Sequence, residues 1–197
     1  MPRRPVLLLA ATLAVATPSF AQDTPRVGHS PYAGEQGREI ASLSGEDLEE
    51  LARGGGWGLA RAAELNGVPG PAHLLELADE IELDAEQRQT IEAIRKAMQR
   101  DTIAAGERFV AAERALDQAF TDAVPDAETL ARLVAEAGEA RTALRLVHLG
   151  AHLQTAPLLS SEQIARYNML RGYAGDPCEA VPVGHNAAMW RRHNGCG

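Results

Sequence analysis

The chain has 197 residues, a formal net charge of −8 at pH 7 and only 4% aromatic residues. An acidic protein is a poor candidate for binding nucleic acid or an anionic membrane surface, so neither is expected as a partner. Abundant alanine and the absence of alternating Val, Ile and Thr runs indicate an all-α fold with no predicted strand.

The N-terminus carries the pattern of a secretory signal peptide. Arg3 and Arg4 are followed by an apolar run over residues 6–16 and by small residues before position 22. The apolar run is too short to span a bilayer. We therefore expect residues 1–21 to be cleaved, which places the mature protein in the periplasm without a membrane span. A retained membrane anchor is the alternative.

Residues 22–43 are rich in Gly, Pro and Ser and are predicted to be extended. Three short helices are predicted next, over residues 46–53, 57–65 and 72–82, separated by glycine and proline turns. The glycine-rich stretch at 54–58 lacks both a preceding strand and a following Lys-Ser/Thr pair, so it does not fit a nucleotide-binding loop. We interpret it as tight turns between packed helices.

Two capping boxes bracket the longest helical patterns in the chain. In each box a small oxygen-bearing residue, Asp84 or Ser160, lies three positions before a glutamine, Gln87 or Gln163. Between the boxes, patterns of about 38 and about 30 residues are interrupted only at residues 124–126. Because helices joined by so short a turn lie antiparallel, the sequence predicts a long helical hairpin with the short helices packed on it.

The two boxes, LDAEQ at 83–87 and LSSEQ at 159–163, resemble the LTxxQ signature of Spy/CpxP-type periplasmic chaperones and the related periplasmic heavy-metal sensors. The match covers residues 83–173 of a predicted helical domain at 44–173. The resemblance implies a stress-response protein that binds unfolded or envelope proteins without ATP. The alternative that it implies is a copper-, zinc- or nickel-binding sensor. The acidic chain departs from the basic client surface typical of such chaperones.

The second long helix carries apolar residues on two sides. One row continues the hairpin seam, and a second row of Leu146, Leu149 and Leu153 lies on the opposite flank. Two apolar sides imply two partners. The short helices are one candidate and a second subunit is the other, so a homodimer is expected.

His148 and His152 are four residues apart, which places both rings on one helix face. With the turn centred near residue 124 or 125, His148 faces Asp101 and His152 faces the region of Met98. These four side chains form the first predicted metal site, and the histidine pair is similar to the His-x-x-x-Met pair of the metal sensors. A buried Asp101–His148 hydrogen bond and pH sensing by His148 are the alternatives.

The only two cysteines, Cys178 and Cys196, lie in a tail predicted to be irregular over residues 174–197. In an oxidising compartment they are expected to form a disulfide, which contributes about 3 kcal/mol in the chain-entropy model. Free thiols or metal ligands are the alternatives.

The same tail holds a second predicted metal cluster. His185, Met189 and His193 share one face if residues 186–193 are helical, and Cys196 is the fourth soft ligand. A disulfide would remove Cys196 from this set. An incidental polar tail is the other interpretation.

Catalytic signatures are missing from the sequence. It has no nucleophile-elbow motif and no haem-attachment motif, and its acidic clusters are typical of solvated helix faces. We therefore do not expect an enzyme.

Overall fold

The structure is a computed structural model that describes residues 28, 30–175, 178, 181, 186–193 and 196, apart from the side chain of His193. The predicted signal peptide lies outside these residues. The chain divides into a compact unit of residues 1–36 and a larger one of residues 37–197, and all the described helices belong to the larger unit.

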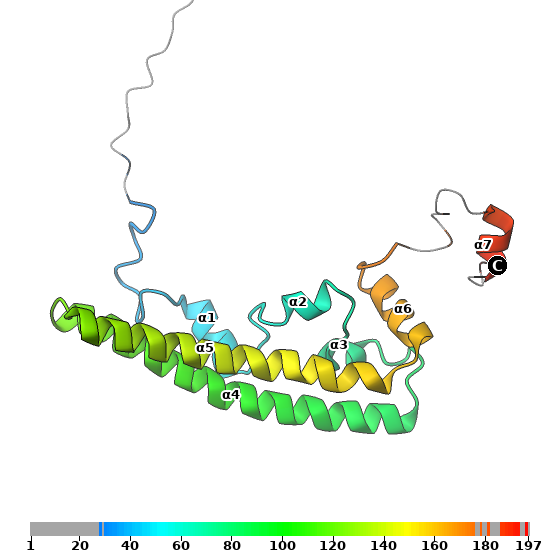
Figure 1. Cartoon of the computed structure of the whole chain (residues 1–197), viewed down its shortest axis with the longest axis horizontal. Helices are drawn as coiled ribbons and strands as arrows, with labels where there is room; N and C mark the ends of the chain where they lie inside the picture. Colours follow the sequence, from blue (N-terminus) through cyan, green and yellow to red (C-terminus); the bar gives the residue numbers. More distant parts are fainter. Residues whose placement is uncertain are drawn as a thin grey trace, which may run out of the picture. The chain divides into compact units, whose positions relative to one another are not determined.

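The described residues form helices and no strand, so the all-α prediction is confirmed for them. None of these helices is long and apolar enough to cross a membrane. The helices are α1 (Gly45–Ala52), α2 (Arg61–Glu64), α3 (Pro71–Glu76), α4 (Ala85–Asp122), α5 (Ala127–Thr155), the 3₁₀ turn Ala156–Leu158, α6 (Ser161–Leu170) and α7 (Ala187–His193) (Figure 1). α2 and α3 are shorter than predicted, and α7 lies in the tail that is predicted to be irregular.

The two long helices, α4 and α5, pack along each other (Figure 1). They have 38 and 29 residues, close to the lengths that the sequence predicts. α4 ends at Asp122 because Ala123 adopts an extended conformation. α5 starts two residues after Pro125, where the Asp126 carboxylate accepts a hydrogen bond from the backbone N–H of Thr129 at 2.8 Å.

The two capping boxes meet in space. The carboxamides of Gln87 and Gln163 donate to each other, with both N–O distances at 2.9 Å. Each carboxamide oxygen also accepts from the N-cap backbone N–H of its own helix, at Asp84 or Ser160. The starts of α4 and α6 are therefore joined by one reciprocal amide pair.

The apolar core consists of two clusters. The first packs α1 against the middle of α4 and α5, and Gly106 allows this approach because a Cβ there would lie 3.2 Å from the carbonyl oxygen of Leu51. The second packs α3 and α6 against the start of α4. Their buried members are Ile40, Leu43, Leu51, Leu59, Ala105, Phe109 and Leu144 in the first, and Leu74, Ala78, Ile81, Leu83, Ile91 and Tyr167 in the second.

The sequence predicts an extended segment over residues 22–43, and its described part differs from this prediction. Residues 31–34 form turns. Ile40 and Leu43 are buried in the first core cluster, and the Leu43 N–H donates to the Ile40 carbonyl oxygen at 3.1 Å. Two large apolar side chains three residues apart reach the same cluster only if the chain turns between them.

Candidate functional site

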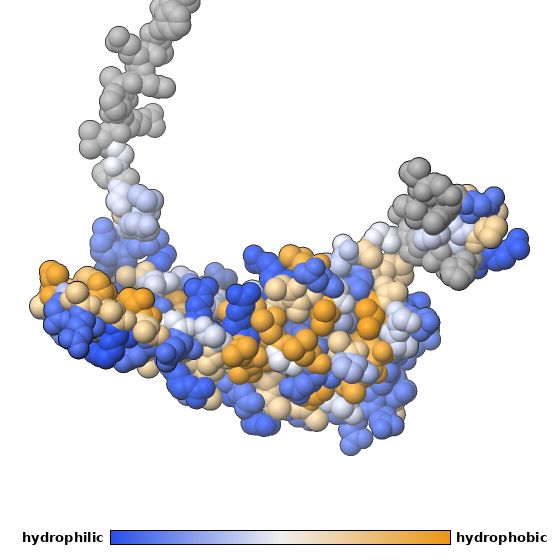
Figure 2. Space-filling view, viewed as in Figure 1, coloured by the Kyte–Doolittle hydropathy of each residue, from blue (hydrophilic) through white to orange (hydrophobic). Residues whose placement is uncertain are grey.

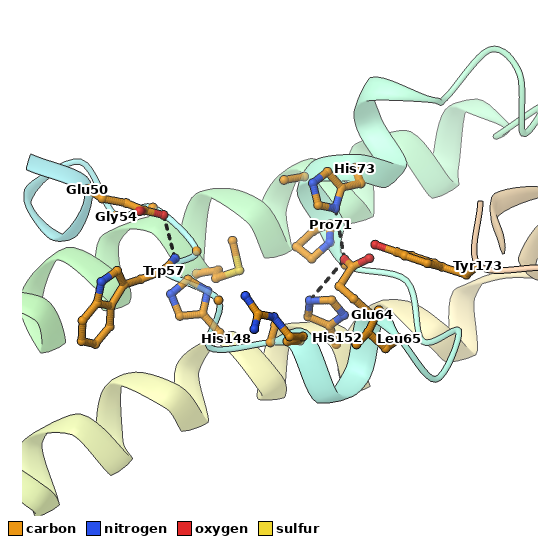
Figure 3. Close-up of a pocket in the computed structure, with 18 residues that line it drawn as sticks. Glu50, Gly54, Trp57, Glu64, Leu65, Pro71, His73, His148, His152 and Tyr173 are labelled. Carbon is orange, nitrogen blue, oxygen red and sulfur yellow. Dashed lines mark hydrogen bonds and ion pairs between the residues drawn. The ribbon is translucent and has the colours of Figure 1, made fainter. Parts of the chain in front are cut away.

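A cavity of about 570 Å³ lies between the α4–α5 pair and the segment that carries α2 and α3. Along α4 it is near Met98, between Ile91 of the second core cluster and Ala105 of the first. At one end Glu50 accepts a hydrogen bond from the Trp57 backbone N–H at 2.7 Å, which holds the glycine-rich turn in place. The polar and sulfur-bearing residues that line it include Glu50, Arg61, Glu64, His73, Met98, His148, His152 and Tyr173 (Figure 3).

Both α5 histidines face this cavity, as their four-residue spacing predicts. His148 is 3% exposed and His152 is 5% exposed. The α2–α3 connection passes directly over His152, and a Cβ at position 70 would lie 2.5 Å from its ring. Gly70 is therefore required for the connection to pass this close to the imidazole.

His152 is oriented by the backbone of the same connection. Its Nδ1 lies 2.8 Å from the carbonyl oxygen of Val68, so Nδ1 carries a proton and donates. In the neutral ring the lone pair is then on Nε2, which lies 3.8 Å from Oε1 of Glu64. A backbone carbonyl that fixes the donor nitrogen in this way is the usual support for a metal-binding imidazole.

His148 has a different environment. Its Nε2 is buried and has no hydrogen-bond partner among the described residues. Burial lowers the pKa of His148, and the neighbouring His152 lowers it further, against a weaker opposing effect of Glu50. The ring is therefore neutral at neutral pH and brings an unpaired nitrogen to the cavity wall. A buried polar atom without a partner is costly and calls for a reason.

Glu64 is the charged centre of the opposite wall. Its carboxylate accepts from the hydroxyl of Tyr167 at 2.7 Å and from Nδ1 of His73 at 3.0 Å. Burial alone would raise the pKa of Glu64, but the hydrogen bonds from Tyr167, His73 and Tyr173 together lower it below its ordinary value. Glu64 is thus an anion, and its main hydrogen-bonding capacity is already used by α3 and α6.

The structure brings Met98, His148 and His152 to one cavity, as predicted, but it does not bring Asp101 there. Asp101 is exposed and does not line the cavity that His148 faces, and no hydrogen bond joins the two side chains, so the predicted hydrogen bond between them is wrong. After Met98 the next inward position of α4 is Thr102, which is fully buried. The inward face of α4 passes from Met98 to Thr102, a step of four residues. Asp101, three residues after Met98, therefore lies on the solvent side of the helix.

Sequence reasoning missed Glu64 and His73 as parts of the site. Both lie on short helices whose packing on α5 has no signature in the sequence. In the sequence Glu64 is one of many acidic residues with no distinguishing pattern, and His73 comes shortly after the proline turn at Pro71. The proline turn was the only available signal, because Pro71 starts α3 at the cavity wall.

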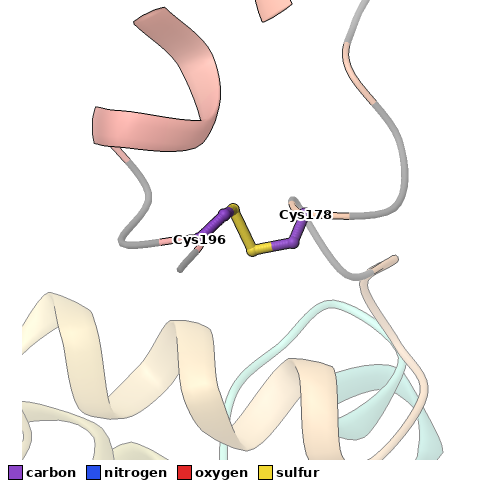
Figure 4. The surroundings of a disulfide bond; sticks show 2 residues. All are labelled: Cys178 and Cys196. Carbon is purple, nitrogen blue, oxygen red and sulfur yellow. A yellow bond between two sulfur atoms is a disulfide. The ribbon is translucent and has the colours of Figure 1, made fainter. Parts of the chain in front are cut away.

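In the tail the structure contains the predicted disulfide between Cys178 and Cys196, with a Cα–Cα distance of 5.5 Å (Figure 4). Cys196 is therefore not a thiolate ligand, and its predicted role in a metal cluster is corrected. Met189 is exposed on α7. His185 and the side chain of His193 lie outside the described residues.

In the part of the chain that the structure describes, no three His, Cys, Asp or Glu side chains are arranged to hold a metal ion together. The cavity offers a smaller donor set, two imidazoles and the thioether of Met98. Comparison with known proteins gives no match to a family model, to a curated protein or to a solved structure, so this donor set has to be interpreted from its own chemistry.

Proposed function

We propose that the protein is a periplasmic metal-binding protein that holds monovalent copper in the α4–α5 cavity through His148, His152 and Met98. The observation that carries the proposal is the buried, unpaired Nε2 of His148 in the same cavity as the lone-pair nitrogen of His152. A metal ion would give both nitrogens the partner that the described residues do not supply.

The donor set favours copper over the zinc and nickel that the sequence also allows. Imidazole and thioether are borderline and soft ligands, and thioether sulfur selects Cu(I) among the common metals. Zinc usually takes four protein or water ligands of nitrogen, sulfur or carboxylate type. Glu64 is occupied by Tyr167 and His73, but its negative charge, 3.8 Å from His152, would stabilise a cation nearby.

The test is an anaerobic Cu(I) titration of residues 22–197 against a competing chelator, repeated with Zn²⁺. We expect one Cu(I) per chain, which is lost when His148 and His152 are both replaced by alanine. Met98→Leu should weaken Cu(I) binding and leave Zn²⁺ binding nearly unchanged. Asp101→Asn is the matched control, because this carboxylate is exposed and outside the cavity.

Three results would contradict the proposal. They are stoichiometric binding that survives the double histidine variant, binding that disappears only when residues 175–197 are removed, and no Cu(I) binding in the intact protein. The second result would move the site to the tail.

A second candidate function, an ATP-independent chaperone or stress-response modulator, is favoured by a separate observation. Phe120, near the end of α4, and Val124, between α4 and α5, are 56% and 90% exposed. Figure 2 shows hydrophobic residues at this end beside a hydrophilic surface. Large apolar side chains that are exposed in this way are suited to weak contact with unfolded protein segments.

Aggregation of an unfolded client, measured with the protein in molar excess, tests this second function. We expect Phe120→Ser/Val124→Ser to weaken protection and the double histidine variant to retain it. Protection unaffected by the serine substitutions would exclude this surface. The expected homodimer belongs to either function and would bring two such ends into one particle.

A further inference from the structure

A second cavity, of about 480 Å³, lies between the segment of residues 57–66 and α5. Three arginines line it, Arg61 of α2 and Arg141 and Arg145 of α5, together with Trp57. Among the described residues, no Asp or Glu lines this cavity. The chain has 27 acidic and 19 basic residues in all, so the charge around the cavity is opposite in sign to that of the whole protein.

The two α5 arginines have no acidic partner on their own helix. Elsewhere on α5, Arg132 is paired with Glu136 four residues later. Four residues after Arg141 comes Arg145, and no position three or four residues from either one is Asp or Glu. Like charges at this spacing repel each other, so the pair is unfavourable for the helix by itself.

Arg61 also lacks a carboxylate partner in the part of the chain that the structure describes. Glu64 follows it by three residues, but this carboxylate accepts hydrogen bonds from Tyr167 and His73. Arg61, Arg141 and Arg145 are all exposed. Their guanidinium groups are therefore open to a ligand from solvent.

Trp57 holds one of these arginines in place. The guanidinium carbon of Arg141 lies over the indole ring, 5.1 Å from the ring centroid. The indole Nε1 donates to the Asp47 carboxylate at 2.7 Å, and the ring packs against Phe109 with a centroid distance of 5.4 Å. Arg141 thus rests on a ring that is itself anchored, which prepares its charge for binding.

The backbone adopts a rare conformation to place this indole. Trp57 has a φ of 42°, in the left-handed region that residues with a side chain seldom occupy. Its neighbour Gly58 has a φ of 64°. Strained conformations of this kind are concentrated at functional sites, and here the strain brings Trp57 to both Asp47 and Arg141.

The chemistry of the cavity favours a small anion with several charges. Guanidinium groups donate paired hydrogen bonds to phosphate and carboxylate oxygens. A tetrahedral phosphate presents acceptors in several directions, which suits arginines that come from two different helices. The indole ring already contacts Arg141 and Phe109, which favours an anion without an aromatic base.

We propose that the cavity between residues 57–66 and α5 binds a small phosphate compound with two or more negative charges through Arg61, Arg141 and Arg145. This site is separate from the proposed copper site and does not depend on it. Arg141 and Arg145 do not line the histidine cavity, whereas Arg61 lines both cavities. Substitutions at Arg145 therefore test the anion site alone.

Titration of residues 22–197 with sodium pyrophosphate tests the proposal. The ionic strength is kept at about 0.15 M, where long-range attraction is largely screened. Calorimetry measures the affinity, and Trp57 fluorescence in a Trp190→Phe background reports binding at this cavity, because the chain has two tryptophans. We expect one pyrophosphate per chain, and weaker binding of citrate.

Arg145→Gln should raise the dissociation constant about tenfold. Arg145→Lys should have a smaller effect, because lysine keeps the charge and loses the paired donors. The matched control is Arg132→Gln, which makes the same change of charge on the same helix outside the cavity and should leave pyrophosphate binding unchanged. Arg145→Gln should retain its helicity and its Cu(I) binding, so the two proposed sites are judged separately.

Four results would overturn the proposal. They are no binding of pyrophosphate, equal weakening by Arg145→Gln and Arg132→Gln, tighter binding of citrate than of pyrophosphate, and binding to phosphatidylglycerol vesicles without binding to pyrophosphate. The second result would indicate general attraction to positive charge. The last result would assign the three arginines to a lipid surface.

Discussion

The inner and outer faces of α5 differ from the usual pattern near the C-terminal end of the helix, where polar side chains are buried and leucines are exposed. Buried on the inner face are His148, His152 and Thr155, while Leu146 and Leu153 are exposed on the outer face. The polar residues are tolerated inside because the α2–α3 connection supplies carbonyl oxygens at Val68 and Pro69 for His152 and Thr155. His152 and Thr155 can therefore be buried in α5 because each has a backbone hydrogen-bond partner there.

Truncating one leucine on each face of α5 tests the difference between the two faces most directly. Leu144→Ala removes a fully buried side chain from the first core cluster and should lower the free energy of unfolding by about 2–5 kcal/mol. Leu153→Ala should cost less than about 0.5 kcal/mol in the monomer. Urea denaturation at protein concentrations below dimer formation measures both. Similar losses would mean that the outer face is covered within the chain.

The two inner histidines should respond differently to replacement by leucine. His152→Leu leaves the Val68 carbonyl oxygen without its donor and should cost about 1–3 kcal/mol. His148→Leu removes a nitrogen that has no partner and should be neutral or stabilising by up to about 1 kcal/mol. Thermal denaturation of the metal-free proteins compares them. Equal destabilisation would indicate that His148 has a structural role of its own.

His148 and Glu64 should affect the free energy of unfolding in different ranges of pH. Because the pKa of His148 in the folded chain is below its ordinary value of about 6.5, the unfolded chain binds more protons. Stability should therefore fall as the pH drops below about 6.5 and should level off below the folded pKa. His148→Leu should flatten this dependence in metal-free protein. An unchanged slope between pH 7 and pH 5 would contradict the assignment.

The contribution of Glu64 is expected in a more acidic range. The pKa of Glu64 is lowered in the folded chain. Glu64 therefore stabilises the fold at pH values above its ordinary pKa, and this stabilisation is lost as the pH falls through the folded pKa. Glu64→Gln should reduce only this acidic part of the profile. Urea denaturation in steps of pH measures both ranges in one series.

The smallest effect is expected from a charged pair on the surface of α5. Arg132 and Glu136 form an ion pair at 2.8 Å with both side chains about half exposed. Arg132→Ala should change the free energy of unfolding by less than about 0.5 kcal/mol, because solvent screens the pair. A larger change, measured in the same urea series, would indicate that this edge of α5 is more enclosed than its exposure implies.

Local signals predicted the helices well, and long-range placement was only partly predictable. The capping boxes at Asp84 and Ser160 and the N-cap at Asp126 start their helices as the sequence indicates, because capping depends on residues a few positions apart. Asp101 was misplaced because a seam written from apolar spacing alone does not distinguish a step of three from a step of four.

Two other errors have a different cause. Glu64 and His73 reach the cavity through the packing of short helices that have little periodicity of their own. Ile40 and Leu43 were assigned to an extended segment because Gly, Pro and Ser dominate its composition, although two apolar residues are enough to anchor it. Contacts of this kind depend on the completed tertiary structure.

The amide pair between Gln87 and Gln163 makes the chain sensitive to a very small chemical change. Each carboxamide must donate and accept at once, so hydrolysis of either one to a carboxylate removes a donor and adds a negative charge beside the other oxygen. Deamidation of either glutamine would thus loosen the first turns of both α4 and α6, which are far apart in the chain. The two positions therefore behave as one site.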